Sequence, residues 1–402
     1  MKIAVINSVQ YGSTGTIARR IAQQARKQGH EVEVYVPRGR HNRKAAVDVN
    51  LFGNQFSEDS HIVLSKITGL NGCYSIIATQ KLISRIQRFS PDVIHLHNLH
   101  NSYICIPLLF RYIKKRNIQV IWTLHDCWAF TGHCPYFTMV KCNKWKTGCC
   151  DCPNYHAYPS CIYDNSRLMW NIKKKWFTGI RNMTIITPSQ WLADLVKQSF
   201  LKEYPVKVIH NGIDLSVFKP TPSDFREKHQ IGEKKKILLG VAFGWGARKG
   251  LDISIELSKR LDPEKYQIVL VGTDAQVDKQ LPSNIISVHR TQNQKELAEI
   301  YTAADVFVNP TREDNYPTVN MEAIACGTPV ITFQTGGSPE MIDEKTGMAV
   351  DAGDISRLEE EIERICNEMP YSREDCLKRA KQFDAQICFE RYVELMENIT
   401  KY

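Results

Sequence analysis

Apolar and polar positions alternate along the first half of the chain in a way that predicts strands separated by helices. Short apolar runs typical of buried strands lie at residues 2–7, 31–36, 93–96, 120–124 and 184–187, and helices are expected from about 16 to 29 and near 107–116. Strands that alternate with helices indicate a parallel sheet covered on both faces. The predicted fold class is therefore α/β.

The same alternation occurs a second time. A short strand at 205–210 leads into a polar, proline-bearing stretch to residue 236. Beyond it, strands are predicted at 237–241, 267–271, 306–309 and 330–333, with helices at 250–261, 295–303 and about 318–326. Three helices, at 355–368, 373–383 and 385–399, close the chain. The pattern predicts two doubly wound domains in series.

The composition is typical of a folded, water-soluble protein of the size of an enzyme. The chain has 402 residues, of which 43% are apolar and 24% charged. It contains no apolar stretch near the ~20 residues that a spanning helix needs, and the apolar run at its start is too short for a signal peptide. A cytoplasmic location is therefore expected, where the 13 cysteines would be thiols or metal ligands.

Charge is unevenly distributed. Residues 1–210 hold 28 Lys and Arg against 11 Asp and Glu, a net charge of +17, whereas residues 211–402 carry −8. A basic half favours an anionic partner such as a lipid surface, a phosphorylated carrier or a nucleic acid, although solvated charge can also segregate by chance. The basic, aromatic segment 167–181 suits a membrane interface, and a core helix with a basic outer face is the alternative.

One stretch near the end of the second domain suggests a ligand site. After the strand at 306–309, a polar loop carries Asp314 and a helix begins near Thr318. The N–H groups of Thr318 and Val319 could bind phosphate oxygens. Glu322 could accept hydrogen bonds from ribose hydroxyls, and Asp314 could hold sugar hydroxyls. The alternative is ordinary helix capping with acidic residues near the N-terminus.

Other candidate ligand-binding residues lie in loops after predicted strands. Lys249 precedes the helix at 250–261 and could reach a pyrophosphate, unless it is simply a solvated surface residue. His125 follows the strand at 120–124, where doubly wound folds bind ligands, although most such histidines are structural. Gly12 and Gly15 allow close backbone approach to a phosphate or acceptor, or only a tight turn.

The stretch 309–330 resembles the signature of the retaining glycosyltransferases of family 4, an acidic residue and a Glu separated by seven residues. Asp314 and Glu322 occupy the two acidic positions, and the run from Glu322 through Ala-x-Ala-Cys-Gly-Thr-Pro-Val is typical of the family. Asp at the first position is shorter than the usual Glu, and Glu313 adjoins it. Gly244 stands where the family usually has an Arg, so Arg248 would substitute or Lys249 would act alone. Further matches are Thr123-Leu124-His125-Asp126, Thr187-Pro188-Ser189, Asn211-Gly212-Ile213-Asp214 and Arg248-Lys249-Gly250.

The resemblance implies a GT-B architecture, with two Rossmann-like domains facing a cleft. Residues 1–210 would form the acceptor domain, with a Cys-rich insertion at about 127–161, and 211–384 the nucleotide-sugar domain, with the last helix (385–402) returning to the first. It implies transfer of a sugar, with retention, from a UDP- or GDP-linked donor to a glycan hydroxyl in surface-polysaccharide synthesis. A polyprenyl-diphosphate-linked acceptor and an anionic membrane surface are the expected partners, with peripheral attachment to the inner face of the cell membrane. His125 would contact the donor sugar.

The implied chemistry needs neither a cofactor nor a divalent metal. No Asp-x-Asp occurs in the chain, so the leaving diphosphate would be neutralised by Lys249, Arg248 and the helix start at Thr318 and Val319. We identify no carboxylate nucleophile of the glycosidase kind. A front-face displacement, in which the leaving phosphate takes the acceptor proton, fits that absence.

The Cys-rich segment predicts a structural zinc. Cys134, Cys142, Cys149 and Cys152 follow a spacing compatible with a closed four-thiolate set. His133, Cys150 and Cys161 are alternative ligands, and unligated buried thiols are the competing interpretation.

Two other functions compete with the enzyme. A non-catalytic sugar-nucleotide-binding protein would keep the same site without turnover. A zinc-knuckle nucleic-acid-binding protein would use the basic half but leaves the C-terminal half unexplained, so we expect no nucleic-acid partner.

Overall fold

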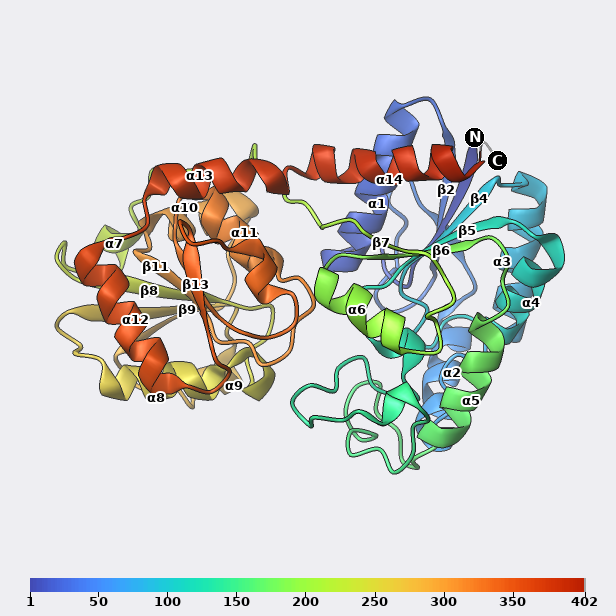
Figure 1. The fold of residues 1–402 in the computed structure, drawn as a ribbon, viewed down its shortest axis with the longest axis horizontal. Helices are drawn as coiled ribbons and strands as arrows, with labels where there is room; N and C mark the ends of the chain where they lie inside the picture. Colours follow the sequence, from blue (N-terminus) through green and yellow to red (C-terminus); the bar gives the residue numbers. More distant parts are fainter. Residues whose placement is uncertain (401–402) are drawn as a thin grey trace. The chain divides into compact units, whose positions relative to one another are not determined.

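The computed structural model describes residues 1–400 and places them in two compact units (Figure 1). Unit 1 contains Met1–His210 together with the residues from Cys388 onward, and unit 2 contains Asn211–Ile387. Each unit is built on its own sheet of parallel strands with helices packed against it. The predicted α/β class with two doubly wound halves is confirmed.

Unit 1 has a seven-stranded sheet in the order β3-β2-β1-β4-β5-β6-β7. Its strands are β1 (Lys2–Ile6), β2 (Glu31–Pro37), β3 (Asn50–Phe52), β4 (Val93–Leu96), β5 (Gln119–Thr123), β6 (Met183–Thr187) and β7 (Val206–Val208). Its helices are α1 (Gly12–Lys27), α2 (Gln55–Thr68), α3 (Ile76–Phe89), α4 (Ile106–Arg116), α5 (Ser166–Phe177) and α6 (Gln190–Gln198). A last helix, α14 (Ala385–Thr400), begins in unit 2, and its residues from Cys388 belong to unit 1.

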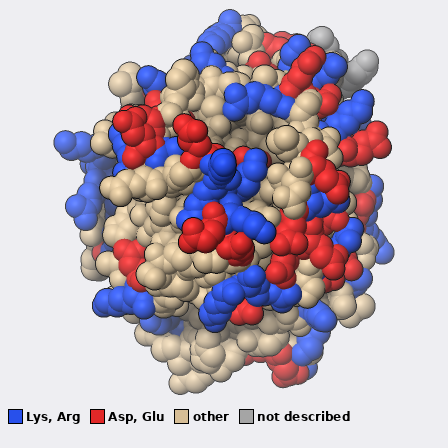
Figure 2. All heavy atoms as spheres, turned by 90° about the vertical axis from the view of Figure 1, so that its left-hand side faces the viewer, with Lys and Arg blue, Asp and Glu red and all other residues tan. Residues whose placement is uncertain are grey.

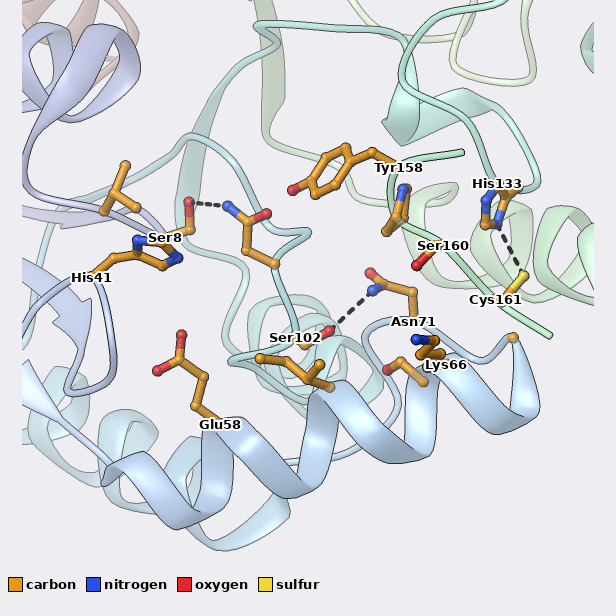
Figure 3. Close-up of a pocket in the computed structure, with 16 residues that line it drawn as sticks. Ser8, His41, Glu58, Lys66, Asn71, Ser102, His133, Tyr158, Ser160 and Cys161 are labelled. Carbon is orange, nitrogen blue, oxygen red and sulfur yellow. Dashed lines mark hydrogen bonds between the residues drawn. The ribbon is translucent and has the colours of Figure 1, made fainter. Parts of the chain in front are cut away.

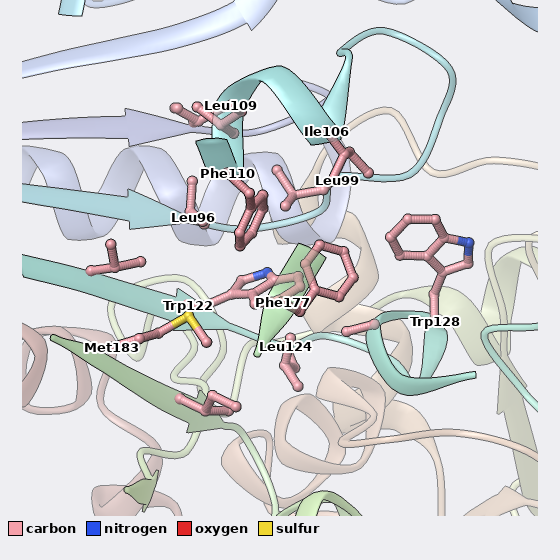
Figure 4. Packing of buried hydrophobic residues seen from close by; sticks show 14 of the residues in the cluster. Leu96, Leu99, Ile106, Leu109, Phe110, Trp122, Leu124, Trp128, Phe177 and Met183 are labelled. Carbon is pink, nitrogen blue, oxygen red and sulfur yellow. The ribbon is translucent and has the colours of Figure 1, made fainter. Parts of the chain in front are cut away.

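The two faces of this sheet are covered by different helices. On one face, Trp122 of β5 packs against Phe110 of α4 and Phe177 of α5, with ring centroids 5.6 and 4.8 Å away (Figure 4). Its indole N–H donates to the carbonyl of His97 at 3.0 Å, which satisfies its one polar atom. On the other face, the ring of His95 lies 5.7 Å from that of Tyr392 in α14. The C-terminal helix thus becomes part of the first unit's core.

Unit 2 has a six-stranded sheet in the order β10-β9-β8-β11-β12-β13. Its strands are β8 (Lys236–Val241), β9 (Tyr266–Val271), β10 (Ile285–Val288), β11 (Val306–Asn309), β12 (Val330–Phe333) and β13 (Gly347–Val350). Its helices are α7 (Phe225–Lys228), α8 (Leu251–Arg260), α9 (Ala275–Asp278), α10 (Gln294–Ala303), α11 (Thr318–Ala325), α12 (Ile355–Glu368) and α13 (Arg373–Ala380). On the face of this unit drawn in Figure 2, acidic and basic side chains are interspersed.

Several elements depart from the sequence prediction. Helix α1 begins at Gly12, four residues before the expected start, so both glycines of the loop lie in its first turn. The elements that were not predicted are strands β3, β10 and β13 and helices α2, α3, α6 (Gln190–Gln198), α7 (Phe225–Lys228) and α9 (Ala275–Asp278). Helix α2 escapes a periodicity analysis because its buried positions are the polar residues Glu58, His61 and Ser65.

The membrane-interface interpretation of residues 167–181 is wrong. Helix α5 turns Met169, Trp170 and Phe177 into the core. Lys173 is fully buried, and its ammonium donates to the carbonyls of Trp128 and Thr131 at 2.8 and 3.0 Å. The segment is a core helix with a basic outer face, which was the alternative interpretation. Among residues 1–400, no helix has the length and apolar character needed to cross a membrane.

Candidate functional site

The strand order of unit 2 places two loops side by side at the carboxyl edge of its sheet. Strands β8 and β11 are neighbours at the centre of the sheet. Strands β9 and β10 lie on the β8 side, and strands β12 and β13 lie on the β11 side. The loops after these strands therefore lie at the switch point where doubly wound sheets bind ligands. The backbone N–H of Arg312 donates to the carbonyl of Arg248 at 2.8 Å, and a Cβ on Gly250 would lie 2.4 Å from the Pro310 carbonyl oxygen. Only glycine permits this close approach of the two loops.

The basic and acidic residues predicted in these loops meet. Lys249 forms an ion pair with Asp314, and both side chains are 17% exposed. Arg248 donates from its guanidinium to the carbonyl of Glu313 at 3.0 Å. The Glu313 residue is buried, whereas Asp314 keeps an accessible carboxylate. Of the two adjacent acids, Asp314 is therefore the one within reach of both Lys249 and a ligand.

Helix α11 starts at the predicted residue, Thr318, and carries Glu322 one turn further on. Pro317 stands at its N-cap and makes no side-chain capping hydrogen bond. A carboxylate oxygen of Glu322 accepts a hydrogen bond from the Tyr301 hydroxyl at 3.1 Å. Burial raises the pKa of Glu322 to about 7, against hydrogen bonds from Tyr301 and Thr318 that lower it. This carboxyl group therefore titrates near neutral pH.

A third loop, absent from the sequence prediction, completes this edge of unit 2. Gly336 adopts φ +56°, and a Cβ there would lie 1.7 Å from the Asp314 carbonyl oxygen. Gly337 donates its backbone N–H to the carbonyl of Asn315 at 2.8 Å. Ser338 follows with a buried hydroxyl that has no hydrogen-bond partner within residues 1–400. The sequence signal for this loop was the pair of adjacent glycines, which begins three residues after the end of the predicted strand at 330–333.

In unit 1 the corresponding switch point lies between β1 and β4. Asn7 follows β1 and accepts through its side-chain oxygen from the backbone N–H of Asn98, which follows β4, at 3.2 Å. His125 follows the next strand, β5, and its Nε2 lies 3.0 Å from Nδ1 of His97. Burial lowers the pKa of His125 to about 4, although Asp126 acts in the opposite direction. His125 is therefore neutral at physiological pH.

The two glycines predicted in the loop after β1, Gly12 and Gly15, differ in the reason that the position favours glycine. Gly12 has φ +70°, and a Cβ there would meet no atom within 4 Å. A Cβ on Gly15 would lie 2.6 Å from the backbone carbon of Gln10, so this glycine lets α1 pack against the loop after β1. Of the residues predicted in unit 2, Arg248 and Lys249 meet the loop of Glu313 and Asp314 that leads into α11, whereas Gly12, Gly15 and His125 belong to the other unit.

The structure does not support the zinc prediction. Within residues 1–400, no group of three or more His, Cys, Asp or Glu side chains is arranged to hold a metal ion. Cys134 and Cys152 form a thiol hydrogen bond, which raises the pKa of Cys134 and lowers that of Cys152. Cys149 instead accepts from the backbone N–H of Gly132 at 3.1 Å. The cysteines fit the competing interpretation of unligated thiols.

Comparison with known proteins defines the class. Residues 14–217 match Glycosyltransferase Family 4, and residues 223–383 match Glycosyl transferases group 1. The chain belongs to the glycosyltransferases of family 4. The Escherichia coli protein named "Putative colanic acid biosynthesis glycosyl transferase WcaC" is 25% identical over 67% of this chain and 66% of its own length. N-acetyl-alpha-D-glucosaminyl L-malate synthase of Bacillus anthracis is 21% identical over 99% of this chain and 96% of its own.

Solved structures support the GT-B fold. Sucrose-phosphate synthase from Thermosynechococcus elongatus has a TM-score of 0.73 at 19% identity and covers 99% of this chain and 98% of its own. Anabaena HepE in complex with UDP has a TM-score of 0.69 at 15% identity, over 99% of this chain and all of its own. The expected architecture of two Rossmann-like domains with a returning C-terminal helix is therefore confirmed.

Proposed function

We propose that this glycosyltransferase transfers a sugar from a UDP- or GDP-linked donor to a hydroxyl of a glycan, with retention at the anomeric carbon. The observation that carries the proposal is the meeting of Lys249 and Asp314 at the switch point of unit 2, in the loop that leads into α11. A cation close to a helix N-terminus suits a diphosphate. Structures of HepE with UDP and with UDP-glucose, and the relation to WcaC, support a nucleotide-sugar donor and a role in polysaccharide synthesis.

Each unit has its own part in the proposed reaction. Unit 2 binds the donor: Lys249 and Arg248 neutralise the diphosphate with the N–H groups of Thr318 and Val319, and Glu322 holds the ribose. Unit 1 binds the acceptor, and its neutral His125 contacts the donor sugar, with Gly12 and Gly15 shaping the adjoining loop.

Proton transfer needs no protein base in this proposal. The acceptor hydroxyl attacks the anomeric carbon from the face that the diphosphate leaves, and a leaving phosphate oxygen takes the hydroxyl proton. Lys249 and the start of α11 stabilise the negative charge that develops on the diphosphate. These groups replace a divalent metal, because the chain contains no Asp-x-Asp to hold one. Asp314 positions the transferred sugar through its hydroxyls.

The proposed setting is the cytoplasmic face of a membrane. The acceptor we propose is a lipid-linked glycan on a polyprenyl diphosphate carrier. Its support is the net charge of +17 on residues 1–210, which is suited to an anionic lipid surface.

A donor panel tests the proposal. Purified protein is heated with UDP- and GDP-sugars, and one of them is expected to raise the melting temperature, since a ligand at 100 times its Kd adds about 2.7 kcal/mol. Lys249→Ala should abolish the shift, while Lys259→Ala, an exposed change near the C-terminal end of α8 in the same unit, should not. With the stabilising donor, proton NMR of the product should show the donor's anomeric configuration. An inverted product would contradict the retaining mechanism.

A further inference from the structure

A cavity of about 490 Å³ opens in unit 1 beside the switch point of its sheet (Figure 3). Ser8 after β1 and Asn101 after β4 line it, and the Asn101 amide donates to the Ser8 hydroxyl at 2.9 Å. Helix α2 and the end of the Cys-rich segment supply the other walls. Its volume falls in the range of small-molecule sites, about 300–1,000 Å³.

Three buried polar atoms of residues that line this cavity have no hydrogen-bond partner within residues 1–400: the Ser65 hydroxyl, the side-chain oxygen of Asn71 and Nε2 of His133. Ser65 and Asn71 are each only 7% exposed. The other end of the Asn71 amide donates to the Ser102 hydroxyl at 3.3 Å, which leaves its oxygen toward the cavity (Figure 3). An unpaired buried polar atom costs about 1–3 kcal/mol, so these atoms are suited to a ligand that supplies hydroxyl donors.

The backbone of the same wall adopts an uncommon conformation. Asn101 and Ser102 have φ angles of +86° and +56°, in the left-handed region that non-glycine residues seldom occupy. Successive residues of this kind are found chiefly where a site fixes them. Both residues line the cavity.

The charge balance of the lining favours a neutral ligand. Lys66 and Glu58 both line the cavity, and burial raises the pKa of Glu58. Ile62 and the ring of Tyr158 supply apolar surface, such as the C–H face of a sugar needs. The Tyr158 hydroxyl lies 3.1 Å from Nδ1 of His100, which positions the phenol.

We propose that this cavity binds a sugar of the acceptor through Asn71 and Ser65, with Tyr158 against the ring. The inference rests on the proposed function and adds its acceptor subsite. Neutral pyranose hydroxyls satisfy the unpaired atoms of Ser65 and Asn71, and the mixed polar and apolar walls match the two kinds of surface on a sugar.

Binding of methyl glycosides tests the subsite. Saturation-transfer NMR of the full chain with a panel of methyl hexopyranosides and methyl N-acetylhexosaminides should find at least one ligand. Asn71→Ala and the rim substitution Ser160→Trp should each weaken its binding at least tenfold. Asn171→Ala on the exposed face of α5 and Ser283→Trp on unit 2 are matched controls that should leave binding intact.

The outcomes separate the subsite from the proposed function. Donor stabilisation by nucleotide-sugars should be the same in the wild type, Asn71→Ala and Ser160→Trp. Failure of every glycoside to bind, or equal binding by wild type and Ser160→Trp, overturns the subsite even if donors bind. Absence of donor stabilisation in the wild type contradicts the proposed function instead.

A second observation concerns the opposite side of α2. This helix buries polar residues and exposes apolar ones, the reverse of an ordinary surface helix. Phe56 is 80% exposed, Val63 55% and Ile67 47%, and at the start of α3 Ile76 and Ile77 are 52% and 69% exposed. A groove of about 550 Å³ lies between the two helices and is lined by Phe56, Leu64, Ile76 and Ile77. Apolar side chains concentrated in this way indicate an interaction surface.

Basic residues surround this apolar groove. Arg38, Lys81 and Arg85 line it, and residues 38–89 hold eight Lys and Arg against three Asp and Glu. Asp59, one of the three acids, is already paired with Arg40 at 2.8 Å. Apolar side chains ringed by positive charge complement an anionic membrane, which offers acyl chains below a negative surface. A second copy of this chain would instead bring like charges together.

We propose that the groove between α2 and α3 docks on an anionic membrane. Sedimentation with vesicles of equal parts phosphatidylcholine and phosphatidylglycerol should pull down the wild type. Ile76→Ser with Ile77→Ser should weaken binding about tenfold or more, and Arg38→Gln with Lys81→Gln about 25-fold at low salt, at about 1 kcal/mol per charge. Lys174→Gln with Lys175→Gln, exposed on α5, is the matched charge control and should have little effect.

Two results would overturn the membrane surface. One is equal vesicle binding by the wild type and the double Ser variant. The other is a dimer in analytical ultracentrifugation that the double Ser variant converts to a monomer with vesicle binding unchanged, which would assign the groove to a second copy of the chain.

Discussion

Lys249 and Asp314 form an ion pair although 65 positions separate them in the chain. The pair exists because β8 and β11 are neighbours, so the loops after them meet. Its consequence is that a negatively charged ligand must compete with Asp314 for the ammonium group. If the Asp314 carboxylate binds the sugar hydroxyls when the donor arrives, the Lys249 ammonium becomes available to pair with the diphosphate.

Removing the Asp314 charge should separate binding from transfer. In Asp314→Asn the ammonium of Lys249 is no longer neutralised, so UDP should bind several-fold more tightly, as measured by calorimetry. Sugar transfer should fall at least a hundredfold, because the sugar loses its carboxylate partner.

Asp252→Asn provides the matched control, since it removes a carboxylate paired with Arg312 next to the same loops. It should change UDP affinity little. Weaker UDP binding by Asp314→Asn would contradict the competition described for Lys249.

The raised pKa of Glu322 predicts that nucleotide binding depends on pH. Its pKa near 7 means that the carboxylate form, which accepts hydrogen bonds from ribose hydroxyls, becomes populated as pH rises through 7. Affinity for UDP should therefore increase between pH 6 and pH 8, and this dependence should disappear in Glu322→Gln. A profile shared by both proteins would assign the titration to another group.

The same group should affect stability in the opposite direction. The folded protein holds the Glu322 proton more tightly than the unfolded chain does, so the free energy of unfolding should fall as pH rises from about 4.5 to about 7. The contribution is at most about 3 kcal/mol from the shift in pKa. The difference between wild type and Glu322→Gln in denaturant titrations isolates it.

Much of the fold was predictable because its strands are buried on both faces. Strands β4, β11 and β12 and helix α12 match their predicted bounds, since continuous apolar runs and strong amphipathicity identify them. Helix α2 was missed because its buried side chains are polar, and β3 because it is only three residues long at the sheet edge. Neither has the apolar pattern on which such predictions rest.

The candidate site was predictable residue by residue but not as an arrangement. Lys249, Asp314 and Glu322 each stood out in a loop or at a helix start, whereas the pairing of Lys249 with Asp314 follows only from the strand order. The sequence analysis placed Lys173 in a basic surface segment. Periodicity indicates which face of a helix a residue occupies, but it cannot show that backbone carbonyls elsewhere in the fold accept hydrogen bonds from a buried lysine. Its two acceptors lie more than 40 residues away along the chain.

Transfer should not depend on divalent metal. Lys249 and the start of α11 supply the positive charge that a metal would otherwise bring to the diphosphate. We expect a chelator such as EDTA to leave the transfer rate within twofold of its untreated value, with Mg²⁺ restored as the control. A loss that Mg²⁺ or Mn²⁺ reverses would contradict this.

The last prediction concerns Lys173, whose ammonium lies 3.3 Å from the centre of the Trp128 ring and holds the start of the Cys-rich segment on α5. Lys173→Met keeps the length of the side chain but leaves the carbonyls of Trp128 and Thr131 unpaired, so it should lower the free energy of unfolding by about 2–4 kcal/mol.

Burial lowers the pKa of Lys173 from 10.5 to about 7, so the folded state favours the neutral amine. The wild type should therefore gain stability as pH rises from about 7 toward 10.5, and Lys173→Met should lack that gain. Lys174→Met, its exposed neighbour, is the matched control; equal denaturation midpoints for the two variants at every pH would show that the buried amino group of Lys173 does not stabilise this segment.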